Sequence, residues 1–369
     1  MSAPKMGLWH AYRLRWKRRR FLFRIWRKRR QITAAVDRTD KIVPGAILAF
    51  ATVRNEIIRL PYFLEHYRGL GVDHFLVVDN GSDDGTAAFL AQQPDVSLWK
   101  TDHSYRLARF GMDWLGWLQW QHGNGHWCLT VDADELLIYP ASESRDLKAL
   151  TAWLDTQGEV SFGALMLDMY PRGPLEDATY QAGDDPTRTL GWFDPDNYRS
   201  QRHHYYGNRW IQGGVRERVF FADEPARAPT LNKTPLVRWS WRYAYVSATH
   251  QILPTRLHGD IDLAGSGKAS GVLLHTKFLP VVGAKSAEEL ERGQHFQNTV
   301  LYQDYHRQLT RNPDLWYHCS CRYEGAAQLV DRPGGREGDL HLGRPRALLQ
   351  PQPDPARPRH DARGGPRPS

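Results

Sequence analysis

The sequence contains few cysteines, only Cys128, Cys319 and Cys321 among 369 residues. Three thiols cannot build a disulfide framework, so we expect a protein of the reducing cytosol. The pair at 319 and 321 follows His318 and could be interpreted as a metal site. Two thiols and one imidazole at this spacing rarely complete a tetrahedron, so we assign no zinc site there.

Long apolar runs are also missing. The longest, such as residues 46–53, have about the length of a strand and are far shorter than the roughly 20 residues that cross a bilayer. The apolar triplet at 21–23 is bracketed by Arg20 and Arg24, so it is not the core of a secretory leader. We predict no transmembrane helix.

Several nucleotide and hydrolase motifs are absent from the sequence. It has no G-x-x-x-x-G-K-[ST], no G-x-G-x-x-G after its first expected strand and no G-x-S-x-G. These absences argue against P-loop, dinucleotide-binding and α/β-hydrolase functions.

Acidic residues are absent from the first 30 positions, which hold 12 Lys and Arg. The whole chain has 49 basic and 41 acidic residues, a net charge of +8. Removing those 12 leaves 37 basic against 41 acidic residues, a net charge of −4. The positive excess therefore belongs to the N-terminal segment.

Residues 8–30 interleave aromatic and aliphatic side chains with Arg and Lys. As a helix, this pattern is typical of a segment in a membrane interface, with apolar groups toward the acyl chains and guanidinium groups at anionic headgroups. A disordered basic leader and a nucleic-acid-binding arm are the alternatives. We predict that residues 1–43 form a basic amphipathic arm on an anionic membrane surface, at the cytoplasmic inner face, and expect no nucleic acid as partner.

Strands and helices alternate after Pro44. Hydrophobic periodicity predicts strands at 46–53, 74–78, 96–100 and 126–131, and helices at 57–70, 87–93 and 107–120. Repeated β-α-β units predict an α/β fold with a Rossmann-like, mostly parallel central sheet flanked by helices. Residues 331–369 hold eight Pro, six Gly and eight Arg, which predicts a disordered tail.

Polar clusters follow three of the predicted strands, at 52–56, 79–86 and 132–135. In an open parallel sheet, ligands bind beyond the carboxyl ends of the strands. Asp132 and Asp134 fall on the same side of an extended chain and could hold Mg²⁺ or Mn²⁺ against a diphosphate, whereas Glu135 points to the other side. Such an acidic pair is by itself also common as a solvated strand end.

Together the three clusters resemble a known family. The segments Val53-Arg54-Asn55-Glu56, Val78 to Thr86 and Val131-Asp132-Ala133-Asp134-Glu135 are similar to family 2 glycosyltransferases, in the bacterial branch related to family 92. The resemblance covers about residues 46–280. It implies a GT-A fold, a UDP- or GDP-type sugar donor, a divalent metal and inversion at the anomeric carbon.

The resemblance also implies a division of the chain and a set of contacts. The glycosyltransferase domain would span 44–330, with a nucleotide-sugar half at 44–140 and an aromatic-rich acceptor half at 141–330. Donor contacts are expected at Thr52, Arg54, Glu56, Asp79, Ser82, Asp84, Asp132 and Lys277. For Asp84, capping of the next helix is an equal alternative.

The metal would be Mn²⁺ or Mg²⁺ and would be held by Asp134, with Asp132 at the ribose or at a metal-bound water. His275 is the expected further metal contact, and His250 competes with it for this role. Each histidine alone is more often structural.

An inverting transfer needs a base for the acceptor hydroxyl proton. Glu217 follows a Gly-Gly turn 83 residues after Asp134 and is our first candidate, with Asp168 in reserve. Because Arg216 and Arg218 flank it, Glu217 could instead be an ion-pairing surface residue.

The sequence thus predicts a metal-dependent, inverting glycosyltransferase that moves a sugar from a nucleotide-sugar donor to a glycan or lipid-linked acceptor. Two alternatives from other classes stay open. One is a membrane- or nucleic-acid-binding protein with a non-catalytic α/β scaffold. The other is a Mg²⁺-dependent nucleotidyltransferase or phosphohydrolase.

Overall fold

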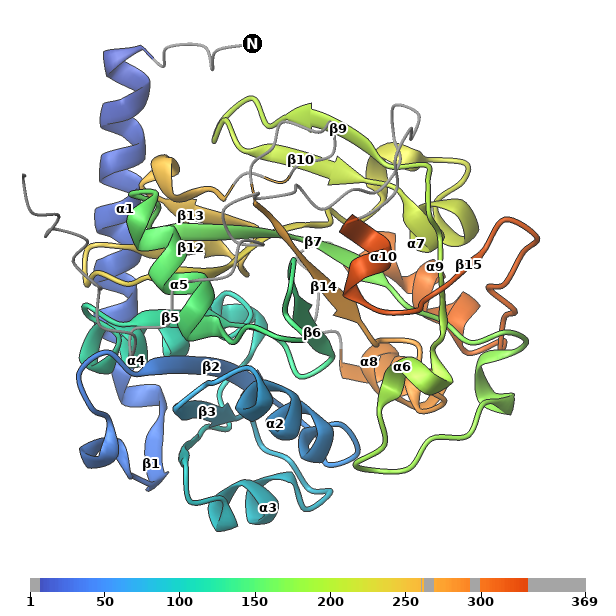
Figure 1. Ribbon diagram of the computed structural model, residues 1–369, viewed down its shortest axis with the longest axis horizontal. Helices are drawn as coiled ribbons and strands as arrows, with labels where there is room; N and C mark the ends of the chain where they lie inside the picture. Colours follow the sequence, from blue (N-terminus) through green and yellow to red (C-terminus); the bar gives the residue numbers. More distant parts are fainter. Residues whose placement is uncertain (1–6, 260, 262–268, 293–298, 331–369) are drawn as a thin grey trace, which may run out of the picture.

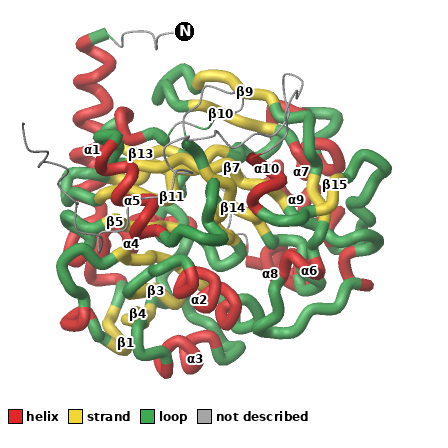
Figure 2. The backbone as a smooth tube through the Cα atoms, in the orientation of Figure 1, coloured by secondary structure: helices red, strands yellow, loops and turns green. Residues whose placement is uncertain are grey.

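A computed structural model describes residues 7–259, 261, 269–292 and 299–330. The chain folds around a nine-stranded central sheet with helices on its outside (Figures 1 and 2). The predicted α/β fold with a Rossmann-like, mostly parallel sheet is confirmed. The tail predicted to be disordered, residues 331–369, lies outside the described residues.

The strand order in the central sheet is β1-β4-β3-β2-β5-β11-β7-β14-β6. Six strands, β4, β3, β2, β5, β7 and β14, run in one direction, and β1, β11 and β6 run in the other. The strands are β1 (Thr33–Val36), β2 (Ile47–Val53), β3 (His74–Asp79), β4 (Val96–Lys100), β5 (Trp127–Thr130), β6 (Glu135–Ile138), β7 (Ser161–Asp168), β11 (Asn232–Arg238) and β14 (Gly271–His275).

Among the described residues, three small two-stranded sheets complete the strands, pairing β9 with β10, β12 with β13 and β8 with β15. Their bounds are β8 (Trp192–Phe193), β9 (Arg199–Arg202), β10 (Arg209–Gln212), β12 (Ala244–Ser247), β13 (Gln251–Leu253) and β15 (Cys321–Arg322). The α-helices are α1 (Leu8–Lys28), α2 (Leu60–Gly69), α3 (Thr86–Gln92), α4 (Met112–His122), α5 (Leu147–Thr156), α6 (Pro186–Thr189), α7 (Gly214–Phe220), α8 (Val282–Arg292), α9 (Thr299–Leu309) and α10 (Ala326–Val330).

All predicted strands and helices between residues 46 and 131 are present, although two helices begin later than expected. The segment before α4 is a short turn of 3-10 helix followed by Arg109, Phe110 and Gly111, which all have positive φ. Positive φ is incompatible with a right-handed helix, so α4 cannot begin before Met112.

The β2 strand shows why the sheet is covered on both sides. Its odd-numbered residues, such as Ile47 and Val53, pack with α2, α3 and α5, whereas Leu48 and Phe50 pack with Trp114 of α4. Side chains alternate along a strand, so a strand that is apolar at nearly every position must be buried on both faces.

The helix predicted within residues 8–30 is present as α1, which runs along one side of the molecule beside α4 (Figure 1). Leu14 and Ile25 of α1 are buried, and the chain continues into β1, which pairs with β4 at the sheet edge. The predicted boundary at 43/44 therefore does not separate this helix from the sheet. No helix among the described residues combines the length and the apolarity needed to span a bilayer.

Candidate functional site

A cleft of about 300 Å³ lies at the carboxyl ends of the parallel strands. The ends of β2, β5 and β14 contribute to it, together with α8 and α9 from the far end of the chain. Seven of the predicted donor and metal residues line it, with Asp132 serving in both roles. They are Thr52, Arg54, Glu56, Asp132, Asp134 and Lys277, joined by His275 as the expected further metal contact.

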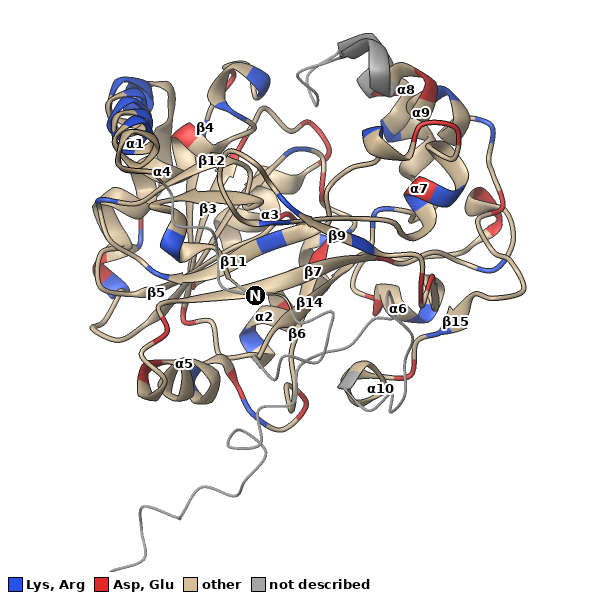
Figure 3. Cartoon of the chain, turned by 90° about the horizontal axis from the view of Figure 1, so that it is seen from above, with Lys and Arg blue, Asp and Glu red and all other residues tan. Residues whose placement is uncertain are grey.

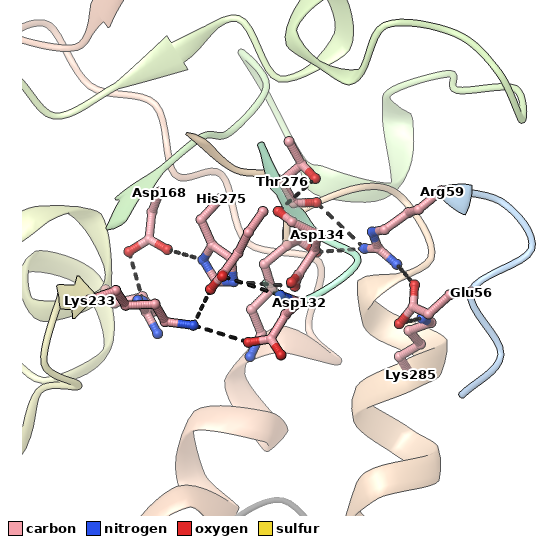
Figure 4. A network of polar contacts seen from close by, with 12 residues as sticks. Glu56, Arg59, Asp132, Asp134, Asp168, Lys233, His275, Thr276 and Lys285 are labelled. Atoms are coloured by element: carbon pink, nitrogen blue, oxygen red, sulfur yellow. Dashed lines mark hydrogen bonds and ion pairs between the residues drawn. The ribbon is translucent and has the colours of Figure 1, made fainter. Parts of the chain in front are cut away.

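Strand register lines up three polar side chains beside one another. Asp168 at the end of β7 is the partner of His275 at the end of β14, and His275 is the partner of Glu135 at the start of β6. The Nδ1 atom of His275 lies 2.6 Å from Asp168 Oδ1, and its Nε2 atom lies 3.2 Å from Asp134 Oδ2 (Figure 4). The imidazole is thus held between two carboxylates.

The charges around His275 shift the pKa values of both His275 and Asp134. Burial alone would lower the pKa of His275, but Asp134 and Asp168 outweigh it and raise the pKa. Burial opposes ionisation of Asp134 as well, yet His275, Arg59 and Lys277 lower the pKa of its carboxyl well below its usual value. Asp134 is therefore a carboxylate at neutral pH, the form that binds cations.

Asp134 and His275 fit a divalent ion as two of its ligands, provided that the imidazole gives up its Nε2 proton when the ion binds. Donor atoms about 3 Å apart can share one ion when each bond is about 2.0–2.2 Å long. A metal-bound histidine usually donates its other ring N–H to a carboxylate, the position that Asp168 occupies. No group of three or more His, Cys, Asp and Glu side chains among the described residues forms a metal cage. Mg²⁺ commonly takes only one or two carboxylates and completes its shell with phosphates and water.

Lys233 of β11 lies between the two remaining carboxylates. Its Nζ atom is 3.1 Å from Asp132 Oδ2 and also contacts Glu135 Oε1. Glu135 is fully buried, and burial raises the pKa of its carboxyl, an effect that Lys233 opposes. The Asp132 side chain is 46% exposed and faces the cleft, and its ion pair with the buried Lys233 holds it in place.

Three further cations form a wall of the cleft close to Asp134. Arg59 contacts Glu56 at 2.8 Å, and Lys285 of α8 contacts the other oxygen of Glu56 at 2.5 Å. Burial, with help from Arg216, lowers the pKa of Lys277 to about 8. Since Glu56 neutralises only part of this charge, the wall is suited to an anionic ligand.

Among the buried polar atoms of cleft-lining side chains, Thr52 Oγ1 and Arg59 Nε lack hydrogen-bond partners within the described part of the chain. Unsatisfied buried groups are rare in native proteins and often mark a place where a ligand or water binds. A Cβ at Gly111, where φ is +76°, would stand 2.5 Å from Thr52 Oγ1. Glycine therefore lets the loop before α4 close over this threonine.

The comparisons with known proteins name no family. No family model matches the chain, and no curated protein matches it either. The distantly similar solved structures include the following two. One is 4-diphosphocytidyl-2C-methyl-D-erythritol synthase, at 17% identity over 39% of this chain and 67% of that chain, with a TM-score of 0.24. The other is a Bacillus anthracis protein assigned as glucose-1-phosphate thymidylyltransferase, at 10% identity over 71% and 83%, with a TM-score of 0.28.

Three predicted donor residues do not line the cleft. Asp79 is buried and accepts a hydrogen bond from the Ser82 hydroxyl, and Ser82 Oγ accepts one from the backbone of Asn55 at 3.0 Å. Asp84 accepts hydrogen bonds from the backbone N–H groups of Ile57 and Thr86. These side chains tie the loop after β3 to the loop after β2.

The backbone of the loop after β3, however, does reach a ligand-accessible surface. Arg54 donates hydrogen bonds to the carbonyls of Asn80 and Gly81. A side pocket adjoins the cleft there and shares its Arg54, Asn80 and Tyr105 walls, while Asp102 lines its far side.

Neither candidate base lines the cleft. Both carboxylate oxygens of Asp168 are occupied, one by His275 and the other by Arg216 Nε at 2.7 Å. Glu217 of α7 contacts Arg199, and only 14% of its side chain is exposed. Its Oε2 atom is buried and has no hydrogen-bond partner among the described residues.

Sequence reasoning missed several cleft residues. These are Arg59, Glu135, Arg216, Lys233 and Lys285. Lys233 carried a usable signal, because a lysine at the start of the apolar strand 232–238 must find a buried partner. Glu135 stood in the predicted cluster at 132–135 but was expected on the other side of the chain. Arg59, Arg216 and Lys285 carried no signal, since nothing in the sequence of α2, α7 or α8 separates a cleft-facing cation from a surface one. His250 lines the cleft but bonds the Asn232 carbonyl through Nδ1 at 2.7 Å, a structural role.

Proposed function

We propose that this protein is a metal-dependent glycosyltransferase of the GT-A type that uses a UDP- or GDP-type sugar donor. The observation that carries this proposal is the pairing of Asp134 and His275, which suits one divalent ion, with the cationic wall of Arg59, Lys277 and Lys285. A diphosphate bound there would be neutralised by the ion and by these cations. The acceptor would be a glycan or a lipid-linked molecule at the cytoplasmic face of a membrane.

The metal, Mn²⁺ or Mg²⁺, would stabilise negative charge on the departing nucleoside diphosphate. Asp134 and His275 would hold it, and Asp168 would keep the imidazole in the tautomer that offers Nε2. Lys277 and Lys285 would bind phosphate oxygens directly. In the transfer, the sugar C1–O bond to the diphosphate breaks, a bond from C1 to the acceptor oxygen forms, and a base takes the acceptor proton.

The side pocket beside the cleft would take the nucleoside. Asn80, Asp102 and Tyr105 offer an amide, a carboxylate and an aromatic ring, which suit hydrogen bonding and stacking with a base and ribose. Asp79 and Ser82 would then not contact the nucleotide directly. Their hydrogen bonds would hold the loop that borders the side pocket. Glu217 and Asp168 are the candidates for the base.

A nucleotidyltransferase is the second candidate, because the same cationic wall could bind a nucleoside triphosphate. One experiment separates the two. A panel of nucleotide sugars is screened with Mn²⁺ by thermal shift, and each stabilising donor is assayed for release of nucleoside diphosphate. A parallel assay supplies nucleoside triphosphates with sugar 1-phosphates and detects pyrophosphate. Diphosphate release supports the proposal, whereas pyrophosphate release from the second mixture alone would overturn it.

A further inference from the structure

The α1 helix has two apolar faces, only one of which packs on the protein. Leu14 and Ile25 are buried against the body, whereas Trp9 is 72%, Trp16 53% and Phe23 58% exposed. At 3.6 residues per turn, the exposed rings and Tyr12 fall within a stripe about 60° wide, on the side of the helix opposite Leu14 and Ile25. We call these four residues, Trp9, Tyr12, Trp16 and Phe23, the aromatic stripe.

The rings of the stripe form a continuous surface near the helix start. Trp9 stacks on Tyr12 at 5.7 Å between ring centroids, and Tyr12 meets Trp16 edge-on at 6.2 Å. From Trp9 to Phe23 the stripe extends about 21 Å along the axis. Folding does not require these exposed rings, because the other face of α1 makes the contacts with the body. A large exposed apolar patch of this kind is typical of an interaction site.

More aromatic rings continue this surface beyond the helix end. The Arg29 guanidinium lies 4.2 Å from the Trp26 ring and 5.8 Å from the Trp117 ring of α4. Trp117 meets Trp120, which stacks on Trp241 at 6.4 Å. The surface is thus shared by α1, α4 and the loop after β11.

The charge beside the stripe is of one sign. Nine Lys and Arg and no acidic residue lie in α1, and Figure 3 shows them gathered around the helix seen end-on. On the helical projection, Arg13, Arg20 and Arg27 follow one border of the stripe, and Arg15 and Arg19 follow the other. The matching partner is therefore apolar in its middle and anionic at its borders.

We propose that the aromatic stripe docks α1 lengthwise into the interface of an anionic lipid bilayer. The rings would enter the acyl boundary while the flanking guanidinium groups bind headgroup phosphates. A second copy of the chain would bring the same positive charge to the same place and be repelled. Phosphates line the surface of a nucleic acid and are bound by Lys and Arg. The middle of the stripe offers exposed rings in place of these cations, so it does not match a nucleic acid.

The inner side of α1 makes this docking rigid. Arg24 contacts Asp113 of α4 at 2.6 Å, and Arg109 contacts the other oxygen of Asp113 at 2.7 Å. Arg24 also reaches the Leu107 carbonyl, two residues from the cleft residue Tyr105. Docking would thus hold the cleft at a fixed height and angle to the lipid surface, where a lipid-linked acceptor would be presented.

The test uses the full chain and vesicles of phosphatidylcholine with or without phosphatidylserine, the kind of lipid that makes the cytoplasmic leaflet anionic. Point variants replace deletion of α1, because deletion would also remove the buried Leu14 and Ile25. The triple variant Trp9→Ser, Trp16→Ser, Phe23→Ser changes only exposed side chains. Val43→Ser, at an exposed apolar residue away from the stripe, is the control.

We expect the parent and Val43→Ser to co-sediment with anionic vesicles, and the triple variant to lose at least tenfold in partitioning. Thermal unfolding and donor turnover without vesicles should match the parent in both variants, so a failure of the proposed catalytic function would not affect this result. Retained vesicle binding by the triple variant, or no binding by the parent, would overturn the proposal. The proposal would also be overturned if the triple variant lost only dimerisation, or only RNA binding, while its vesicle binding was unchanged. Either result would assign the aromatic stripe to that partner.

Discussion

Asp168 holds His275 by a contact of 2.6 Å between Oδ1 and Nδ1, from the neighbouring parallel strand. Since Arg216 occupies the other oxygen of Asp168, this carboxylate is fixed in position and has no free oxygen to offer an acceptor. Its place suits orientation of a metal ligand better than proton transfer.

Asp168→Asn should therefore weaken Mn²⁺ binding. Loss of such a supporting carboxylate typically costs about 10- to 100-fold in metal affinity. Titration calorimetry with Mn²⁺ measures this directly, without any turnover. Unchanged Mn²⁺ affinity together with a large fall in kcat would instead identify Asp168 as the base.

Asp134→Ala should abolish donor turnover, because it removes the carboxylate that faces the cleft beside His275. The fold should persist, since the Asp134 side chain is partly exposed and its backbone carbonyl is still bound by Thr276. Circular dichroism and Mn²⁺-dependent donor hydrolysis are the measurements, with Asp83→Asn on the exposed loop as control. Metal-dependent turnover by Asp134→Ala would refute the metal assignment.

The sequence predicted the edge of the sheet where this site lies, but not the full set of its members. Asp132 and Asp134 lie in the loop after β5, and Thr52 is the penultimate residue of β2, so local pattern was sufficient for them. Lys233 joins Asp132 and Glu135 from 98 to 101 residues away, through the antiparallel strand β11. Such long-range pairing leaves no periodic trace in one sequence.

The directions in which side chains point were the second feature that could not be predicted from the sequence. The loop 79–86 was predicted at the donor site, and its backbone does border the side pocket, but Asp79 turns inward to Ser82. For α1, the pattern predicted an amphipathic helix. It did not reveal that Leu14 and Ile25 would pack on the body, because a helix with apolar residues on two sides gives no indication of which side is covered.

His66 should make stability depend on pH. Burial lowers its pKa from 6.5 to about 4, and its Nε2–H donates to the Leu137 carbonyl at 3.1 Å. Between these pH values the unfolded chain binds more protons than the folded one, so stability falls as pH drops below 6.5. At pH 5.5 the loss from this residue is about 1.4 kcal/mol.

Urea unfolding at pH 8 and pH 5.5 measures this change. His66→Gln keeps a donor for Leu137 but does not titrate. In this variant the difference between the free energies of unfolding at the two pH values should be smaller by about 1.4 kcal/mol. An equal difference in both proteins would show that His66 is already accessible to protons in the folded state.

Glu217→Gln tests the first candidate for the catalytic base. Glu217 Oε1 contacts Arg199, while Oε2 is buried and has no hydrogen-bond partner among the described residues, so one oxygen is available for a proton. Glu217 itself does not line the cleft, so to act as base it must move there with α7, which already carries Arg216 into the cleft. We expect kcat to fall by about 10²- to 10⁴-fold with little change in donor KM, since the ground-state complex loses no contact. Arg199→Gln is the matched control, because it breaks the same ion pair but keeps the carboxylate. Equal, small effects of both substitutions on kcat, with similar losses in thermal stability, would mean that the pair is structural and that the base lies elsewhere.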